Sequence, residues 1–280
     1  MNLMNKTVSA GAFAAAALLG ATQVSAAPVI VNSSLANIGT TFDNVITATG
    51  STLVTTQVIS GQNVYNYIDK DGNNATVTVT RTSSGSAAMP SGGYSSGGIS
   101  LSGAVWDISP AASPAGGGSG LLPDIPGYNS GLTFTFSSAV NAFGFEIGDW
   151  ATCCTTGTRP ANVVTSYAVP STGSGLWIAF DGGAATLPAN ALSASDNPGY
   201  AEARSYTNFI GAIDSSGFFS KVTFFGDGFG EYLVAGGTLR FASVPKGSVG
   251  GDVPEPASLA LLGLGLAGLA AARRRTAPKH

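Results

Sequence analysis

The stretch LTFTF at residues 132–136 decides the fold, because its apolar and polar residues alternate strictly. A period of two places successive side chains on opposite faces of a β-strand. A second apolar stretch runs from Val140 to Trp150, and residues 137–139 stand between the two. The sequence therefore predicts two antiparallel strands that pair with each other, with their turn near residues 137–139.

Similar patterns recur on both sides of this pair. Short alternating pieces run from Val29 to Ile68, and further strands are predicted at 99–108, 162–169, 176–180, 205–213, 218–225 and 238–244. Residues 83–98 and 111–127 are dense in Gly, Ser and Pro, which predicts long loops. We expect no amphipathic helix before residue 253. The predicted fold class is all-β, an antiparallel two-sheet sandwich or jelly roll, because a parallel sheet would need helical crossovers.

One hairpin has a local signature. Asp71-Gly72 lies between the alternating residues 65–68 and 75–80, and this dipeptide readily adopts the two left-handed conformations of a type I′ turn. Residues 69–73 resemble a calcium-binding loop superficially, but glycine stands fourth instead of sixth. A hairpin is the better interpretation.

The composition limits the class of protein. The 280 residues include 39 glycines and only 10% are charged, which suits short strands and tight turns. Between Pro28 and Asp252 there are seven Lys or Arg and fourteen Asp or Glu, a net charge of −7. We expect no nucleic-acid partner, because a negative surface repels the phosphate backbone.

Both ends of the sequence carry targeting patterns. Lys6, an apolar run from residue 8 to 21 and small residues at 24–27 predict a signal peptide over residues 1–27, read by the Sec machinery. A retained anchor is the alternative, although the run is short for a hydrocarbon core of about 30 Å. Between the two ends, residues 28–245 are the predicted ectodomain and residues 246–252 a Gly-rich spacer.

The C-terminal pattern has three parts in a fixed order. Val253-Pro254-Glu255-Pro256 precedes an almost uncharged run at 257–272, and Arg273-Arg274-Arg275 follow. An apolar run that ends in arginines predicts a transmembrane helix at 257–272 with its basic tip, 273–275, in the cytoplasm.

This order resembles the PEP-CTERM sorting signal of Gram-negative bacteria, over residues 253–275. The resemblance implies export, transient anchoring in the inner membrane, and processing by an exosortase-type membrane protease. It also implies a final place at the cell surface or in the extracellular polysaccharide matrix. Residues 143–150 and 224–230 resemble strand and turn segments in the β-sandwich ectodomains of this family, which implies fold and delivery but no activity.

Four acidic residues stand beside glycines and aromatics: Glu146, Asp149, Asp227 and Glu231. If their loops meet at one edge of the sandwich, these carboxylates and backbone carbonyls could hold Ca²⁺, which takes six to eight oxygen ligands. Solvated turn residues are the simpler interpretation. A glycan hydrolase would need two carboxyl groups roughly 5 to 10 Å apart, and nothing in the spacing selects such a pair.

The only two cysteines, Cys153 and Cys154, are adjacent. Export to an oxidising compartment favours pairing, so a vicinal disulfide is predicted, with free buried thiols or a redox or metal role as alternatives. The one histidine is His280, at the extreme C-terminus, and it would be removed with the tail. We therefore expect no His-dependent catalytic site, and no enzyme, in the mature domain.

Aromatic side chains could stack on sugar rings if they are exposed. Trp150, Tyr94 and Tyr128 are the candidates, whereas Trp177 lies within an apolar strand and is expected in the core. The leading hypothesis is an exported, non-enzymatic sandwich that binds or reinforces exopolysaccharide. The alternatives are a carboxylate-based glycan hydrolase and a passive surface protein without a ligand.

Overall fold

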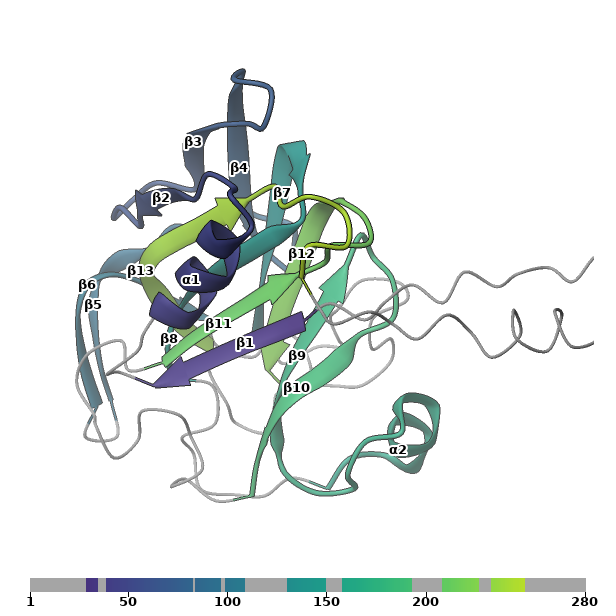
Figure 1. Ribbon diagram of the computed structural model, residues 1–280. Coiled ribbons are helices and arrows are strands. Elements are labelled where there is room, and N and C mark those ends of the chain that lie inside the picture. The colour runs from purple at the N-terminus through teal and green to yellow at the C-terminus, as the bar shows by residue number, and fades with distance from the viewer. Residues whose placement is uncertain are drawn as a thin grey trace, which may run out of the picture.

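The computed structural model describes residues 29–34, 39–82, 84–96, 99–108, 130–149, 158–192, 208–226 and 233–249. Within these ranges the chain forms two antiparallel β-sheets and two short helices (Figure 1). The predicted all-β, two-sheet sandwich is confirmed.

The first sheet, sheet A, has seven strands. Its order is β1 (Val29–Ser34), β11 (Asn208–Ile213), β8 (Ala142–Asp149), β13 (Leu233–Ala242), β6 (Ile99–Ile108) and β5 (Ser91–Ser96). β2 (Val54–Gln57) pairs with the second half of β13. The predicted bounds of β6 are confirmed. The predicted loop 83–98 is wrong in part, because β5 lies inside it.

The second sheet, sheet B, has six strands. Its order is β10 (Thr186–Ala191), β9 (Ser174–Phe180), β12 (Phe219–Gly226), β7 (Ser130–Val140), β4 (Asn74–Arg81) and β3 (Val64–Ile68). β7 contains the alternating stretch 132–136, and its inward residues Leu132, Phe134 and Phe136 are buried. The period of two therefore predicted the buried face correctly.

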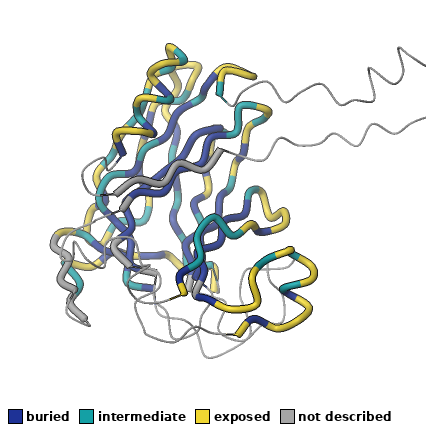
Figure 2. Tube along the Cα trace, turned by 60° about the horizontal axis from the view of Figure 1, so that its bottom comes forward, coloured by how far each residue is buried: buried dark blue, intermediate teal, exposed yellow. Residues whose placement is uncertain are grey.

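Aromatic rings fill the space between the sheets. Phe134 of sheet B lies 4.6 Å from Phe143 of sheet A between ring centroids, and Phe145 of sheet A lies 4.7 Å from Phe224 of sheet B. All four side chains are fully buried, and Figure 2 shows long dark-blue segments through the middle of the domain. Such ring pairs add to the stabilisation from burial alone.

β7 and β8 are consecutive but lie in different sheets, so the predicted pairing of the two is wrong. The chain crosses between sheets at Asn141, which is 1% exposed. Its side chain accepts the N–H of Val244 at 2.7 Å and donates to the carbonyl of the same residue at 2.9 Å. Its own carbonyl accepts the N–H of Asp214 at 2.7 Å. Because these hydrogen bonds satisfy its buried polar groups, Asn141 can stabilise the crossing of the chain from one sheet to the other.

Helix α1 (Thr40–Ala48) covers the outer face of sheet A. Phe42 and Ile46, one turn apart, are both fully buried there. Glycines make room for this packing: a Cβ on Gly211 would lie 2.5 Å from a ring carbon of Phe42, and one on Gly144 would lie 2.2 Å from a ring carbon of Phe209. The expectation of no helix before residue 253 is therefore wrong.

Helix α2 (Ala161–Tyr167) replaces the strand predicted at 162–169. Val163 is buried against the outer face of sheet B, in a cluster with Trp177 and Phe225. Tyr167, four residues further, lies edge-on to Trp177 at 5.7 Å. Packing at helical spacing overrides the strand preference of the β-branched residues in this segment. The predicted burial of Trp177 is confirmed.

The hairpin of β3 and β4 is confirmed, with Ile68 opposite Asn74. Its turn is not type I′, because among the described loop residues only Gly72 has a positive φ, +82°. Asp69 instead organises the loop: one carboxylate oxygen accepts the N–H groups of Asp71 at 2.9 Å and Asn73 at 2.8 Å. These bonds widen the loop to five residues.

The targeting segments, residues 1–27 and 253–275, and the predicted loop 111–127 lie outside the described residues. Within the described ranges, neither helix has the length and apolar content needed to cross a membrane. The predicted domain boundaries stay predictions.

Candidate functional site

A cavity of about 340 Å³ opens at one end of the sandwich, beside the β3–β4 hairpin. Small-ligand sites have volumes of roughly 300 to 1,000 Å³. Strands from both sheets and the hairpin loop contribute to its wall. The lining residues are Thr52, Val54, Tyr67, Ile68, Asp69, Lys70, Gly72, Val140, Phe241, Ala242 and Ser243.

The inner wall of the cavity is apolar and aromatic. Tyr67 and Phe241 pack edge to face at 4.7 Å between ring centroids, and both are buried. The Tyr67 hydroxyl donates to the backbone carbonyl of Ser138, and burial raises the pKa of the phenol. The ring is therefore fixed and neutral at physiological pH. Ile68, by contrast, is 52% exposed.

The rim of the cavity carries two fixed charges from the hairpin loop. The backbone N–H of Asn73 is the largest of the contacts that lower the pKa of Asp69, whose second oxygen accepts the hydroxyl of Ser138 at 3.0 Å. A hydrogen bond to Asp71 at 2.6 Å raises the pKa of Lys70. Near neutral pH a ligand would meet the Asp69 carboxylate, the Lys70 ammonium group paired with Asp71, and the hydroxyl groups of Thr52 and Ser243.

Sequence reasoning missed this cavity. It identified residues 69–73 only as a turn, because the partners of the loop come from β2 and β13, far away in the sequence. The feature of the sequence that could have indicated the cavity is an aromatic residue, Tyr67, two positions before a loop with charged residues.

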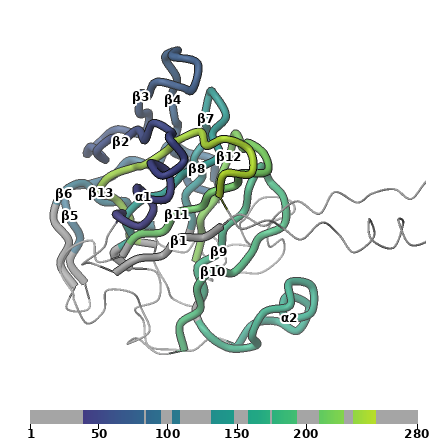
Figure 3. Tube along the Cα trace, viewed as in Figure 1, coloured from purple at the N-terminus to yellow at the C-terminus, as the bar shows by residue number. Residues whose placement is uncertain are grey.

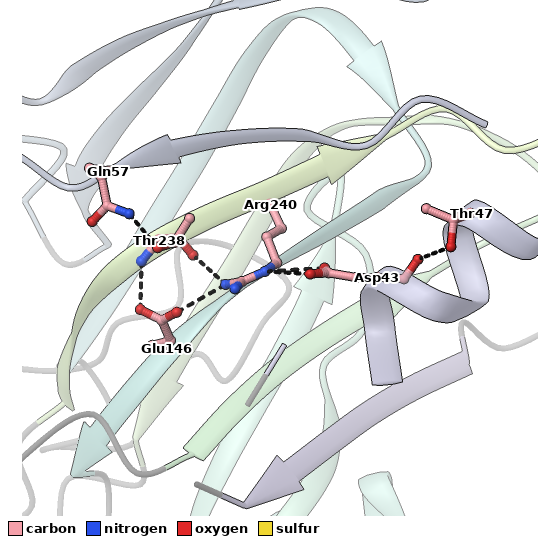
Figure 4. A network of polar contacts seen from close by, with 6 residues as sticks. All are labelled: Asp43, Thr47, Gln57, Glu146, Thr238 and Arg240. Carbon is pink, nitrogen blue, oxygen red and sulfur yellow. Dashed lines mark hydrogen bonds and ion pairs between the residues drawn. The ribbon is translucent and has the colours of Figure 1, made fainter. Parts of the chain in front are cut away.

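Glu146, one of the predicted calcium ligands, lies in the sheet and is already bonded (Figure 4). One carboxylate oxygen accepts from Nη1 of Arg240 at 3.0 Å, and the other accepts the backbone N–H of Thr238 at 2.6 Å. The side chains of Glu146 and Arg240 are only 11% and 13% exposed. The structure therefore gives Glu146 a role in holding two strands of sheet A together.

A bulge in β13 explains why the backbone N–H of Thr238 bonds to this carboxylate. Gly236 pairs with Glu146 and Arg240 pairs with Gly144, so three residues of β13 stand opposite one residue of β8. Gly237 in the bulge has φ +66°, and a Cβ there would lie 1.3 Å from an oxygen of Glu146. Glycine is required at this position, because the carboxylate occupies the space of any side chain.

Arg240 also holds α1 to the sheet. Its Nε donates to Oδ2 of Asp43 at 3.3 Å and lies 3.1 Å from Oδ1 as an ion-pair contact. The guanidinium stacks on the ring of Phe209, 5.3 Å from its centroid. The Arg240 guanidinium thus contacts α1, the carboxylate beside the β13 bulge and the ring of Phe209, all on the outer face of sheet A.

The other predicted calcium ligands are only partly placed. The backbone of Asp149 pairs with Val234, which also pairs with Asp107 of β6 on the other side. Burial raises the pKa of Asp107, and its Oδ1 is buried without a hydrogen-bond partner among the described residues. Asp227 and Glu231 lie outside the described residues, and the described ranges contain no group of three or more metal-ligating side chains. The calcium site stays a prediction.

The remaining candidates are placed as follows. Tyr94 lies in β5 and is half-buried. Trp150, Tyr128, Cys153 and Cys154 lie outside the described residues, so the stacking and disulfide predictions for them are untested.

Comparison with known proteins gives one match. No curated protein and no solved structure matches the chain. A family comparison assigns residues 252–275 to the PEP-CTERM protein-sorting motif, which contains Val253, Pro254, Glu255, Pro256 and the three arginines Arg273, Arg274 and Arg275. This motif implies an exported protein with a membrane-anchored C-terminal signal that an exosortase processes. The chain thus carries a PEP-CTERM sorting motif after a β-sandwich.

Proposed function

We propose that this chain is a non-enzymatic protein of the extracellular polysaccharide matrix, which binds a polysaccharide segment in the cavity beside the β3–β4 hairpin. The observation that carries the proposal is the PEP-CTERM motif on an exported sandwich with such a cavity. The sorting motif would deliver the sandwich to the extracellular matrix, where polysaccharide is the ligand at hand.

The chemistry of the cavity supports a sugar ligand. Its apolar wall, with Val54, Val140 and Ile68, suits the C–H face of a sugar ring, while Thr52 and Lys70 offer hydrogen bonds to hydroxyl groups. Small apolar sites with a few placed polar groups are the usual form of a ligand pocket.

The contacts of Glu146 support a role without catalysis. A general acid or nucleophile must reach the glycosidic bond, whereas both oxygens of this carboxylate are bonded inside sheet A. The test is incubation of the exported protein with exopolysaccharide. We expect no new reducing ends, and their steady release would favour the hydrolase.

Binding is tested with the full-length exported protein on a glycan array and on purified exopolysaccharide, with and without Ca²⁺. Ile68→Ala and Lys70→Ala should weaken retention several-fold. Val64→Ala, on the same strand but outside the cavity, and Lys221→Ala on β12 are the matched controls and should bind normally.

No retention on any polysaccharide, with or without Ca²⁺, would remove the ligand from the proposal and leave a passive surface protein. Retention that Ile68→Ala and Lys70→Ala do not change would place the binding site elsewhere. Loss of retention with a chelator would support the predicted calcium site.

A further inference from the structure

The segment after β13 does not leave the sandwich directly. It forms a strap, residues 245–249, that folds back over the body of the domain in the yellow part of Figure 3. Ser248 N–H donates to the carbonyl of Pro245 at 3.1 Å, and Gly247 between them has φ +73°. A type II turn requires such a left-handed residue at its third position.

Contacts to the turn between β11 and β12 fix the strap. The N–H of Gly247 donates to the carbonyl of Ser215 at 3.0 Å, and the hydroxyl of Ser215 donates to the carbonyl of Val249 at 2.6 Å. Val249 packs against the buried cluster under α1, which contains Val244 and Ile213. The last described residue is therefore bonded to the domain.

The sorting motif begins very close to this bonded residue. Only Gly250, Gly251 and Asp252 separate Val249 from Val253. Four Cα steps span at most about 14 Å even when fully extended. While the strap is docked, Val253 at the start of the motif cannot lie further than this from Val249, and the Pro-Glu-Pro triplet follows directly.

A processing enzyme that binds the peptide backbone on the N-terminal side of the triplet would compete with the docked strap. Proteins that recognise an extended peptide commonly bind several residues on both sides of the key position, through the peptide backbone. Here the residues on the N-terminal side include Gly247 and Val249, whose backbone groups are already bonded to Ser215.

We propose that residues 245–249 are a releasable strap that restrains the sorting motif, and that exosortase processes the chain in the undocked state. Within the part of the chain that the structure describes, few contacts must open: two hydrogen bonds to Ser215 and the packing of the half-buried Val249. Release is therefore compatible with an intact sandwich. The inference rests on the sorting motif and is independent of polysaccharide binding.

The test measures the rate of precursor processing by pulse-chase in exosortase-containing cells. Ser215→Ala removes the hydroxyl that bonds Val249 and should raise the rate about two- to tenfold, the range expected for one lost hydrogen bond. Ser216→Ala is the matched control, because its hydroxyl bonds only Asp214 among the described contacts. This variant should process like the unchanged chain.

Tether length supplies an independent arm. A six-residue Gly-Ser insertion after Val249 should also raise the rate of precursor processing. In the Ser215→Ala variant, the same insertion should raise the rate little further. Deletion of Gly250 and Gly251 should slow processing, and less so in the Ser215→Ala background.

Hydrogen exchange on the full-length protein checks the docked state directly. The Gly247 amide should be protected, and Ser215→Ala should reduce that protection while the amides of β12 stay protected. Faster exchange at Gly247 without faster processing would overturn the proposal. A rate that responds to the insertion but not to Ser215→Ala would also overturn it, because tether length alone would then control access.

Discussion

The two faces of sheet A are stabilised by different forces. On the inner face, rings such as Phe143 and Phe145 pack against sheet B, and their contribution depends on volume and burial. On the outer face, Arg240 joins Glu146 and Asp43, and its contribution depends on particular partners (Figure 4). An apolar core tolerates volume-conserving changes. A buried ionic network does not tolerate the loss of one member, because the remaining charges stay unpaired.

The largest effect should come from the core that the inner face of sheet A shares with sheet B. Phe134→Ala removes a fully buried ring that contacts Trp106, Phe143, Phe145 and Phe224. We expect a loss of about 3–5 kcal/mol in the free energy of unfolding, measured by chemical denaturation. Thr135→Ala, the next residue on the exposed face, should cost less than about 1 kcal/mol. Equal losses would mean that the inner face is not the main source of stability.

The outer face should show a smaller but partner-dependent effect. Arg240→Met should cost about 2–3 kcal/mol, below the full cost of breaking a buried pair because Asp43 is 30% exposed. Adding Glu146→Gln removes the unpaired charge and keeps an acceptor for the Thr238 N–H, so the double variant should recover part of that loss. A double variant with the sum of both single losses would show that charge pairing is not what this network supplies.

The core between the two sheets also contains two phenols, and these predict a pH dependence. Burial raises the pKa of Tyr65 and of Tyr67 above the ordinary value of 10.0. The folded state therefore holds these protons more tightly than the unfolded state, so their contribution is fully present below pH 10 and is lost as pH rises through the folded-state pKa. Denaturation from pH 8 upward should show stability falling above pH 10. Tyr65→Phe with Tyr67→Phe should flatten that fall, and an unchanged slope would contradict the assignment.

The smallest effect on stability should come from the rim of the cavity. Lys70 and Asp71 form an exposed pair, with 47% and 60% of their side chains accessible. Lys70→Ala should leave the free energy of unfolding almost unchanged, because an exposed ion pair contributes little to stability. The same variant should weaken polysaccharide retention, which separates binding from folding. A large stability loss would show that the loop is part of the structural network.

The alternating pattern predicted the inner face well, because burial on one side of a strand appears directly in the order of residues. It did not predict which strands pair. β7 and β8 looked like a hairpin, and the crossing at Asn141 depends on bonds to Val244 and Asp214. Those residues lie far away in the chain, so no local pattern could reveal the corner.

The outer face was not predictable for the same reason. Asp43 and Arg240 are 197 residues apart, and the helix that carries Asp43 has only Phe42 and Ile46 as its apolar signal. Glu146 was noticed as an acid in a strand, but its partner Thr238 becomes available only because β13 bulges at Gly237. The cavity likewise joins the hairpin loop to β2 and β13. Sequence could identify the charged side chains but not their partners.

The central claim is that the sorting motif determines where the sandwich is delivered. The most direct measurement is pulse-chase with membrane fractionation of a chain carrying Pro254→Ala, Glu255→Ala and Pro256→Ala together. The account predicts that the unprocessed form accumulates in the inner membrane, while the unchanged chain is processed and leaves it. Normal processing and release of the triple variant would contradict the account.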